Sequence, residues 1–109
     1  MKKIMVIFDV PDMTLKQYEK SVEDLKLTGG LSSSGQLYHV AGQDPNTGNL
    51  VVTDVFESEE AFNRFSDKLM PVLKKLGVTH VKPQIIPVHN IILNGSYFLY
   101  EKSYAYNIK

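Results

Sequence analysis

Three polar side chains interrupt stretches that otherwise read as buried strands. His39 lies in "QLYHVAG", Asp54 in "LVVTDVFE" and His89 in "IIPVHNII". Burying an imidazole or a carboxylate without a partner is costly, so we expect these residues to be paired, solvated or at a cavity. A carboxylate can orient an imidazole, which then acts as a general base near neutral pH. His39, Asp54 and His89 are therefore the candidate catalytic residues.

A structural explanation of these three residues remains open. A histidine or aspartate on a strand also satisfies a neighbouring backbone end or bridges two subunits. Because side chains alternate across a sheet, Asp54 shares a face with Phe56. Whether His39 faces the same side depends on the register of the hairpin through "QDPNTGN", which the sequence does not fix. On the last strand, His89 and Asn90 point to opposite faces, and we expect His89 to point inward.

The apolar periodicity predicts the elements that position these side chains. Thr14 and Gln17 form a capping-box pattern at the start of one helix, and "TGG" at 28–30 ends it. Ser58 caps a second helix, which Pro71 should kink or restart. The expected elements are a strand over 2–10, a helix over 14–27, a hairpin over 36–57, a helix over 58–76 and a strand over 82–92.

The order β-α-β-β-α-β predicts a ferredoxin-like α+β fold, an antiparallel sheet with both helices on one face. Its strands are apolar on both faces, and the helices cover only one. An uncovered apolar face on a chain of 109 residues predicts a partner, most simply a second copy packed sheet against sheet.

The C-terminal residues extend this core. We expect one domain over 1–93 and an aromatic-rich extension over 94–109. Asn94-Gly95 is a two-residue hairpin signal, so residues 96–100 are predicted to return as an added strand or arm.

Composition excludes several partners. The chain has 12 basic and 12 acidic residues, no basic stripe, and no apolar run of the roughly 20 residues that span a membrane. We therefore expect neither nucleic acid nor membrane as a partner. With no cysteine and no signal-peptide pattern, the expected location is the cytoplasm.

The segments "QLYHVAG", "VVTDVFESEEAFNRF" and "PVHNII" resemble the antibiotic-biosynthesis-monooxygenase-like family of the dimeric α+β barrel superfamily, over about residues 2–92. The resemblance implies a homodimer whose sheets close into a barrel, with one small-molecule cavity per subunit. Members include cofactor-independent oxygenases of aromatic polyketides, isomerases and haem-degrading enzymes. The haem-degrading branch uses a tryptophan and a helical histidine. This chain has no tryptophan, Phe65 stands at what resembles that position, and the second helix contains no histidine.

The resulting functional hypothesis is a homodimer that binds an aromatic or ring-bearing metabolite and acts on it as a monooxygenase without metal or cofactor. The base deprotonates a phenol or enol, and the anion reacts with oxygen. Tyr38 and Asn90 are the expected hydrogen-bonding partners of the substrate, with Phe56 and Phe65 as further substrate-binding residues. The alternative is a non-enzymatic binding or stress-response module on the same barrel.

Overall fold

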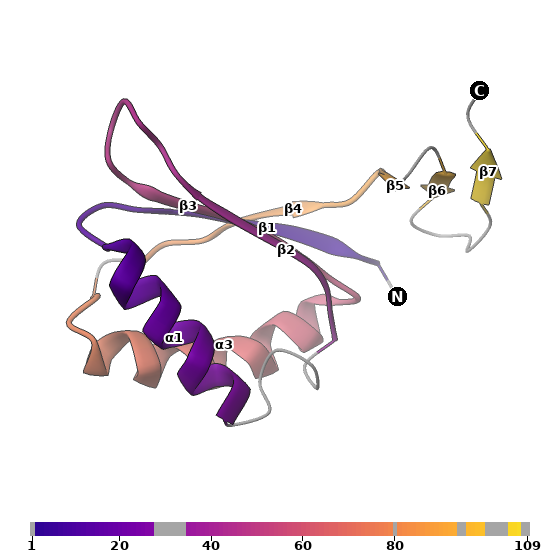
Figure 1. The fold of residues 1–109 in the computed structure, drawn as a ribbon. Coiled ribbons are helices and arrows are strands. Elements are labelled where there is room, and N and C mark those ends of the chain that lie inside the picture. The colour runs from indigo at the N-terminus through magenta and orange to yellow at the C-terminus, as the bar shows by residue number, and fades with distance from the viewer. Residues whose placement is uncertain (1, 28–34, 80, 94–95, 100–104, 108–109) are drawn as a thin grey trace.

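The computed structural model describes residues 2–27, 35–79, 81–93, 96–99 and 105–107. The elements of its body are β1 (Ile4–Val10), α1 (Leu15–Leu27), β2 (Gln36–Gln43), β3 (Leu50–Phe56), α3 (Glu59–Lys75) and β4 (Gln84–Pro87). The strands form one antiparallel sheet in the order β2-β3-β1-β4, and both helices lie against the same face (Figure 1). The predicted ferredoxin-like α+β fold is confirmed.

Local hydrogen bonds at the start of α1 confirm the predicted capping box. The backbone N–H of Thr14 donates to Gln17 Oε1 at 2.8 Å, and the backbone N–H of Gln17 donates to Thr14 Oγ1 at 3.1 Å. The Gln17 amide also donates to the carbonyl of Leu76 at 3.1 Å, which ties α1 to the end of α3. The predicted end of this helix at 28–30 lies outside the described residues.

Helix α3 begins and ends at the predicted signals. Ser58 accepts a hydrogen bond from the backbone N–H of Ala61 at 3.1 Å. At the other end Gly77 has a φ of 83°, and the N–H of Val78 donates to the carbonyl of Leu73 at 2.9 Å, a Schellman ending. The helix runs as one element through Pro71, so the expectation that it restarts there is wrong.

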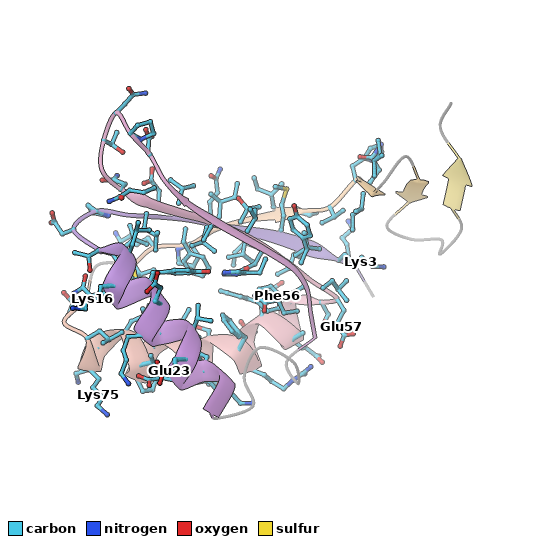
Figure 2. All side chains as sticks on the ribbon, viewed as in Figure 1. Lys3, Lys16, Glu23, Phe56, Glu57 and Lys75 are labelled. Atoms are coloured by element: carbon cyan, nitrogen blue, oxygen red, sulfur yellow. The ribbon has the colours of Figure 1, made fainter. Side chains whose placement is uncertain are left out.

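The core lies between the sheet and the two helices. Alternate residues of β1 and β3 point into it, and α3 contributes an apolar stripe that includes Phe62, Phe65, Leu69 and Leu73. Figure 2 shows the Phe56 ring reaching from the sheet into this layer, whereas the labelled charged side chains lie on the outside. Asp54 is the exception in the inward row of β3, because it is a carboxylate with only 1% of its surface exposed.

The predicted strand over 82–92 is not continuous. β4 pairs with β1 only from Gln84 to Pro87, opposite Ile7 to Ile4. Beyond that point β1 has ended, and the last link is a hydrogen bond from the N–H of Val88 to the carbonyl of Lys3. The chain then leaves the sheet. His89 therefore lies in the connection after β4, which corrects its expected place within a strand.

A second, smaller sheet follows, made of β5 (Asn90–Leu93), β6 (Ser96–Leu99) and β7 (Ala105–Asn107) in that order. Leu93 pairs with Ser96, so the predicted added strand is confirmed, although the turn at 94–95 lies outside the described residues. β7 was not expected. Figure 1 shows this sheet beside the body, away from the helices. The boundary predicted after residue 93 stays a prediction; the main sheet itself ends at Pro87.

Candidate functional site

A small cavity lies between the sheet and the two helices. Its volume is about 50 Å³, and its wall is almost entirely apolar. The lining residues are Phe8, Val10, Met13, Tyr18, Ser21, Val22, Leu25, His39, Leu50, Val52, Asp54, Phe65, Leu69, Leu73 and Val81. The polar side chains of this wall are therefore the groups that decide what the cavity can bind.

Strand register brings His39 and Asp54 together in this wall. The hairpin turn is closed by hydrogen bonds from the N–H of Asp44 to the carbonyl of Asn49 and from the N–H of Gly48 to the carbonyl of Asp44. The pairing that follows places His39 directly opposite Asp54. His39 Nδ1 lies 2.5 Å from Asp54 Oδ1. Because an ionised carboxylate only accepts hydrogen bonds, the imidazole Nδ1–H is the donor.

A β-bulge at Leu37 adds Gln36 to the same carboxylate. In a regular strand, residues 36 and 39 point to opposite faces, because they are separated by an odd number of positions. The pairing shifts between Gln36 and Tyr38, so one extra residue is inserted and the parity changes. Gln36 Nε2 then donates to Asp54 Oδ1 at 2.9 Å. Asp54 thus holds two donors from β2.

Tyr18 completes a hydrogen-bonded chain. Its hydroxyl lies 2.6 Å from His39 Nε2, and the two rings are parallel within 1°, with centroids 5.9 Å apart. In the tautomer that carries its proton at Nδ1, Nε2 accepts from the phenol. The chain of donors runs from Tyr18 on α1 to His39 on β2 and ends at Asp54 on β3.

The phenol of Tyr18 is held in its neutral form. Burial raises the pKa of Tyr18 above its ordinary value, and the nearby negative charge of Asp54 raises this pKa further. At neutral pH the hydroxyl therefore remains a donor to His39. The backbone carbonyl of Tyr18 accepts a hydrogen bond from Ser21 Oγ at 2.6 Å, which satisfies a second polar group of the wall.

This arrangement has the parts of an acid–base site. A proton delivered to Nε2 would convert His39 to imidazolium, and the Asp54 carboxylate at Nδ1 would stabilise that charge. His39 is also within reach of solvent, because 26% of its side chain is exposed against 2% for Asp54. In the structure the hydroxyl at Nε2 is that of Tyr18.

Two of the predicted aromatic residues lie on the helix side of the sheet. Phe65 lines the cavity, and Phe56 packs behind it with ring centroids 5.2 Å apart. Phe56 is fully buried and is not part of the cavity wall. It supports the wall by packing.

The other predicted residues lie elsewhere. His89, Tyr38 and Asn90 line an open groove on the opposite face of the sheet, with a volume of about 510 Å³. The structure therefore brings together His39 and Asp54 of the three catalytic candidates and places His89 on the other side. Catalytic roles for these residues remain predictions.

Tyr18 and Gln36 are the site residues that sequence reasoning missed. Tyr18 lies on the apolar stripe of α1, so packing alone explains a tyrosine at this position and nothing in the sequence marks it as a site residue. Gln36 would have required knowledge of the bulge. In the part of the chain that the structure describes, no cluster of three or more histidine, cysteine or acidic side chains could hold a metal ion.

The comparisons identify the class of fold. No family model and no curated protein sequence matches this chain. Solved structures do match, at sequence identities that show the fold alone, and these structures share the ferredoxin-like α+β architecture described above.

Three structures illustrate the likeness. A dimeric ferredoxin-like protein of unknown function from Thermobifida fusca aligns at 13% identity over 80% of this chain and 92% of its own, with a TM-score of 0.58. SnoaB, a cofactor-independent oxygenase from Streptomyces nogalater, aligns at 11% over 81% and 94%, with a TM-score of 0.61. A candidate antibiotic biosynthesis monooxygenase from Chloroflexus aurantiacus aligns at 18% over 79% and 92%, with a TM-score of 0.54. The fold expected from the resemblance is confirmed.

Proposed function

We propose that this protein is a homodimer that binds a ring-bearing small molecule in the cavity on the helix side of its sheet. The observation that carries the proposal is the contact between the buried Asp54 carboxylate and His39 Nδ1 in the wall of an otherwise apolar cavity. Such a wall binds the ring of a ligand through apolar contacts and orients it through one polar group. The site is narrowed to His39 and Asp54, because His89 lies on the other face.

The chemistry proposed for the site is cofactor-independent monooxygenation. His39 removes the proton from a phenol or enol of the ligand, and Asp54 stabilises the imidazolium. The electron-rich carbon of the resulting anion forms a bond to O₂, and the proton held by His39 passes to the peroxide. Loss of water then leaves a carbonyl, so one oxygen atom stays in the product and the other leaves as water. Among the similar structures, SnoaB carries the description of a cofactor-independent oxygenase.

The homodimer is proposed from the uncovered face of the sheet. Neither α1 nor α3 lies over that face (Figure 1), and it exposes apolar side chains such as Tyr38 at 46% and Val40 at 48%. Contiguous apolar surface of this kind marks an interface. The Thermobifida fusca structure and a structure with the same fold from an uncultured marine organism are both described as dimeric.

A non-enzymatic binding or stress-response module is the second candidate. It is favoured by the contact between the Tyr18 hydroxyl and Nε2 of His39, because this contact occupies the nitrogen that a general base would use.

Oxygen uptake with dithranol, a hydroxylated anthrone whose anion reacts with O₂, tests the proposal. We expect saturable uptake by the wild type, with conversion of the ring methylene to a carbonyl. His39→Gln should lower kcat about 100-fold, the usual contribution of a general base. His89→Gln, the same change on the opposite face, should leave kcat unchanged.

Saturable binding of dithranol without oxygen uptake would exclude the oxygenase and support the binding module. Equal losses in the two histidine variants would contradict the assignment of the site to the helix side. The cytoplasmic location and the absence of nucleic-acid and membrane partners remain predictions from the sequence. Among the described residues, no helix is both long and apolar enough to cross a bilayer.

A further inference from the structure

Both ring nitrogens of His39 have partners in the protein: Nδ1 bonds to Asp54, and Nε2 bonds to the Tyr18 hydroxyl. Nδ1 donates to Asp54, so Nε2 is the only acceptor that the imidazole can offer to a ligand. Tyr18 fills this position with a phenol. If the cavity binds a ligand through His39, as proposed above, the ligand competes with Tyr18 for a single lone pair.

The contact between Tyr18 and His39 lies at an edge of the molecule. β2 is an outer strand of the sheet, and His39 bridges from it to α1 through the Tyr18 hydroxyl. Both residues are only partly buried, whereas Asp54 behind them is fully buried. The cavity wall is therefore partly open to solvent at this contact, where the Tyr18–His39 hydrogen bond joins the helix to the strand.

The size of the cavity requires a wall residue to move. An apolar cavity of about 150 Å³ is enough for benzene, but the present cavity has about 50 Å³. Phe65, Leu69 and Leu73 are more than nine-tenths buried in the core and cannot leave without exposing apolar surface. Tyr18 is partly exposed and carries a polar end that water can satisfy. Its displacement therefore costs less than that of these three core residues.

We propose that Tyr18 stands in for the ligand, and that the natural ligand is a planar hydroxyarene whose own hydroxyl displaces the Tyr18 phenol from His39 Nε2. The inference rests on the proposed function and names its ligand class and its point of entry. The position already accommodates a phenol whose ring is parallel to the imidazole. Displacing Tyr18 supplies both the space for a ring and the acceptor for its hydroxyl.

The environment of Tyr18 suits a stand-in that is not itself consumed. Burial and the charge of Asp54 raise its pKa, so its proton stays on the phenol oxygen. A ligand hydroxyl whose acidity approaches that of an imidazolium, with a pKa of about 6.5, would instead transfer its proton to His39. At Nε2, Tyr18 is therefore an unreactive hydrogen-bond donor, whereas an acidic ligand hydroxyl is a reactive one.

The test compares 2-naphthol with 2-methylnaphthalene, which has the same ring system and no hydroxyl. Binding of both to the wild type, Tyr18→Phe and Tyr38→Phe is measured by ligand fluorescence titration. Tyr38→Phe is the matched control, because it removes the same atom on the opposite face. Folding of each variant is checked by circular dichroism.

In Tyr18→Phe the competitor for Nε2 is gone, so 2-naphthol should bind about 3- to 10-fold tighter than to the wild type. 2-Methylnaphthalene needs the same space but cannot replace the hydrogen bond to Nε2, so it should bind more weakly than 2-naphthol to both proteins and should also gain from Tyr18→Phe. Tyr38→Phe should behave as the wild type. In the wild type carrying ¹³C-labelled tyrosine, saturation with either ligand should shift the resonance that Tyr18→Phe removes.

Binding of both ligands without a preference for the hydroxyl, and without an effect of Tyr18→Phe, would overturn the inference and leave small-molecule binding intact. If Tyr18→Phe weakens the binding of both ligands equally, Tyr18 only forms part of the cavity wall, and the inference is overturned. Failure of every folded variant to bind either ligand would overturn the inference and the proposed function together.

Discussion

The two faces of the main sheet carry similar residue types in opposite physical settings. On the helix side, His39 meets a carboxylate that is 1% exposed, and each donor in the chain from Tyr18 to Asp54 has an acceptor. On the other side, His89 and Tyr38 line an open groove among exposed apolar side chains. A buried carboxylate therefore orients the imidazole of His39 on one face, whereas the imidazole of His89 lies at the surface on the other.

This difference teaches that burial, more than residue type, decides which polar residues form a site. A buried carboxylate without donors is unfavourable, so Asp54 needs both His39 and Gln36. Surface residues can be satisfied by water and carry no such requirement. The helix side accordingly satisfies its polar groups within the protein, whereas the polar groups of the outer face are open to solvent.

Removal of the buried carboxylate should have the largest effect. Asp54→Ala leaves the Nδ1–H of His39 and the amide of Gln36 without their acceptor, so we expect the free energy of unfolding to fall by about 3 kcal/mol. Asp9→Ala removes an exposed carboxylate that bonds Asn49 at 2.9 Å and should cost about 0.5 kcal/mol or less. Urea unfolding at one fixed protein concentration compares them. Equal costs would contradict the distinction between the faces.

A charge on the outer face should weaken the dimer. Val40→Glu places one carboxylate from each subunit in an apolar interface, and we expect the dissociation constant to rise at least about 100-fold. Leu15→Glu is the control, because Leu15 on α1 is exposed to the same extent, 48%. Sedimentation velocity over a concentration series measures both. A Val40→Glu protein that remains as dimeric as the control would place the interface elsewhere.

A like charge beside Asp54 should have a smaller effect. Gln36→Glu replaces a donor to Asp54 by a second carboxylate, and the expected loss is about 2 kcal/mol at pH 7. Gln43→Glu, on the same strand but exposed, should change stability by no more than about 0.5 kcal/mol. Thermal and urea unfolding give the comparison. If the two variants are equally stable, the bulge does not bring residue 36 to the carboxylate.

The smallest effect concerns alkaline pH. Because the pKa of Tyr18 is raised in the folded state, its contribution to stability is complete below the unfolded pKa of about 10 and is lost as pH rises through the folded pKa. The stability difference between wild type and Tyr18→Phe should therefore shrink above pH 10. Unfolding measured from pH 8 to 11.5 tests the sign. A difference that grows with pH would contradict the burial of this phenol.

Local signals in the sequence predicted the elements well. Thr14, Ser58 and Gly77 mark helix ends through hydrogen bonds to near neighbours, so their effect is visible without the rest of the fold. The polarity of His39, Asp54 and His89 within apolar stretches marked all three as residues that needed partners, but did not show which of them meet. What could not be predicted depends on distant residues. β4 ends because β1 has ended, and this is a property of the pairing, not of "IIPVHNII".

Tyr18 shows a second limit. A tyrosine on a helical stripe has an ordinary packing role, and only the approach of α1 to the edge strand reveals its bond to His39. The register of the hairpin sets the same limit for His39, because a shift of one residue would have turned it to the outer face.

The bulge at Leu37 sets which side chains of "GQLYHV" point to the cavity and which point to the outer face, because it adds one residue to β2. A substitution changes one side chain and leaves these directions in place. Deletion of one residue here would reverse the directions on one side of the bulge, so that Gln36 and His39 could no longer both reach Asp54. New specificity on this scaffold is therefore as accessible through a change of strand length as through a change of side chain.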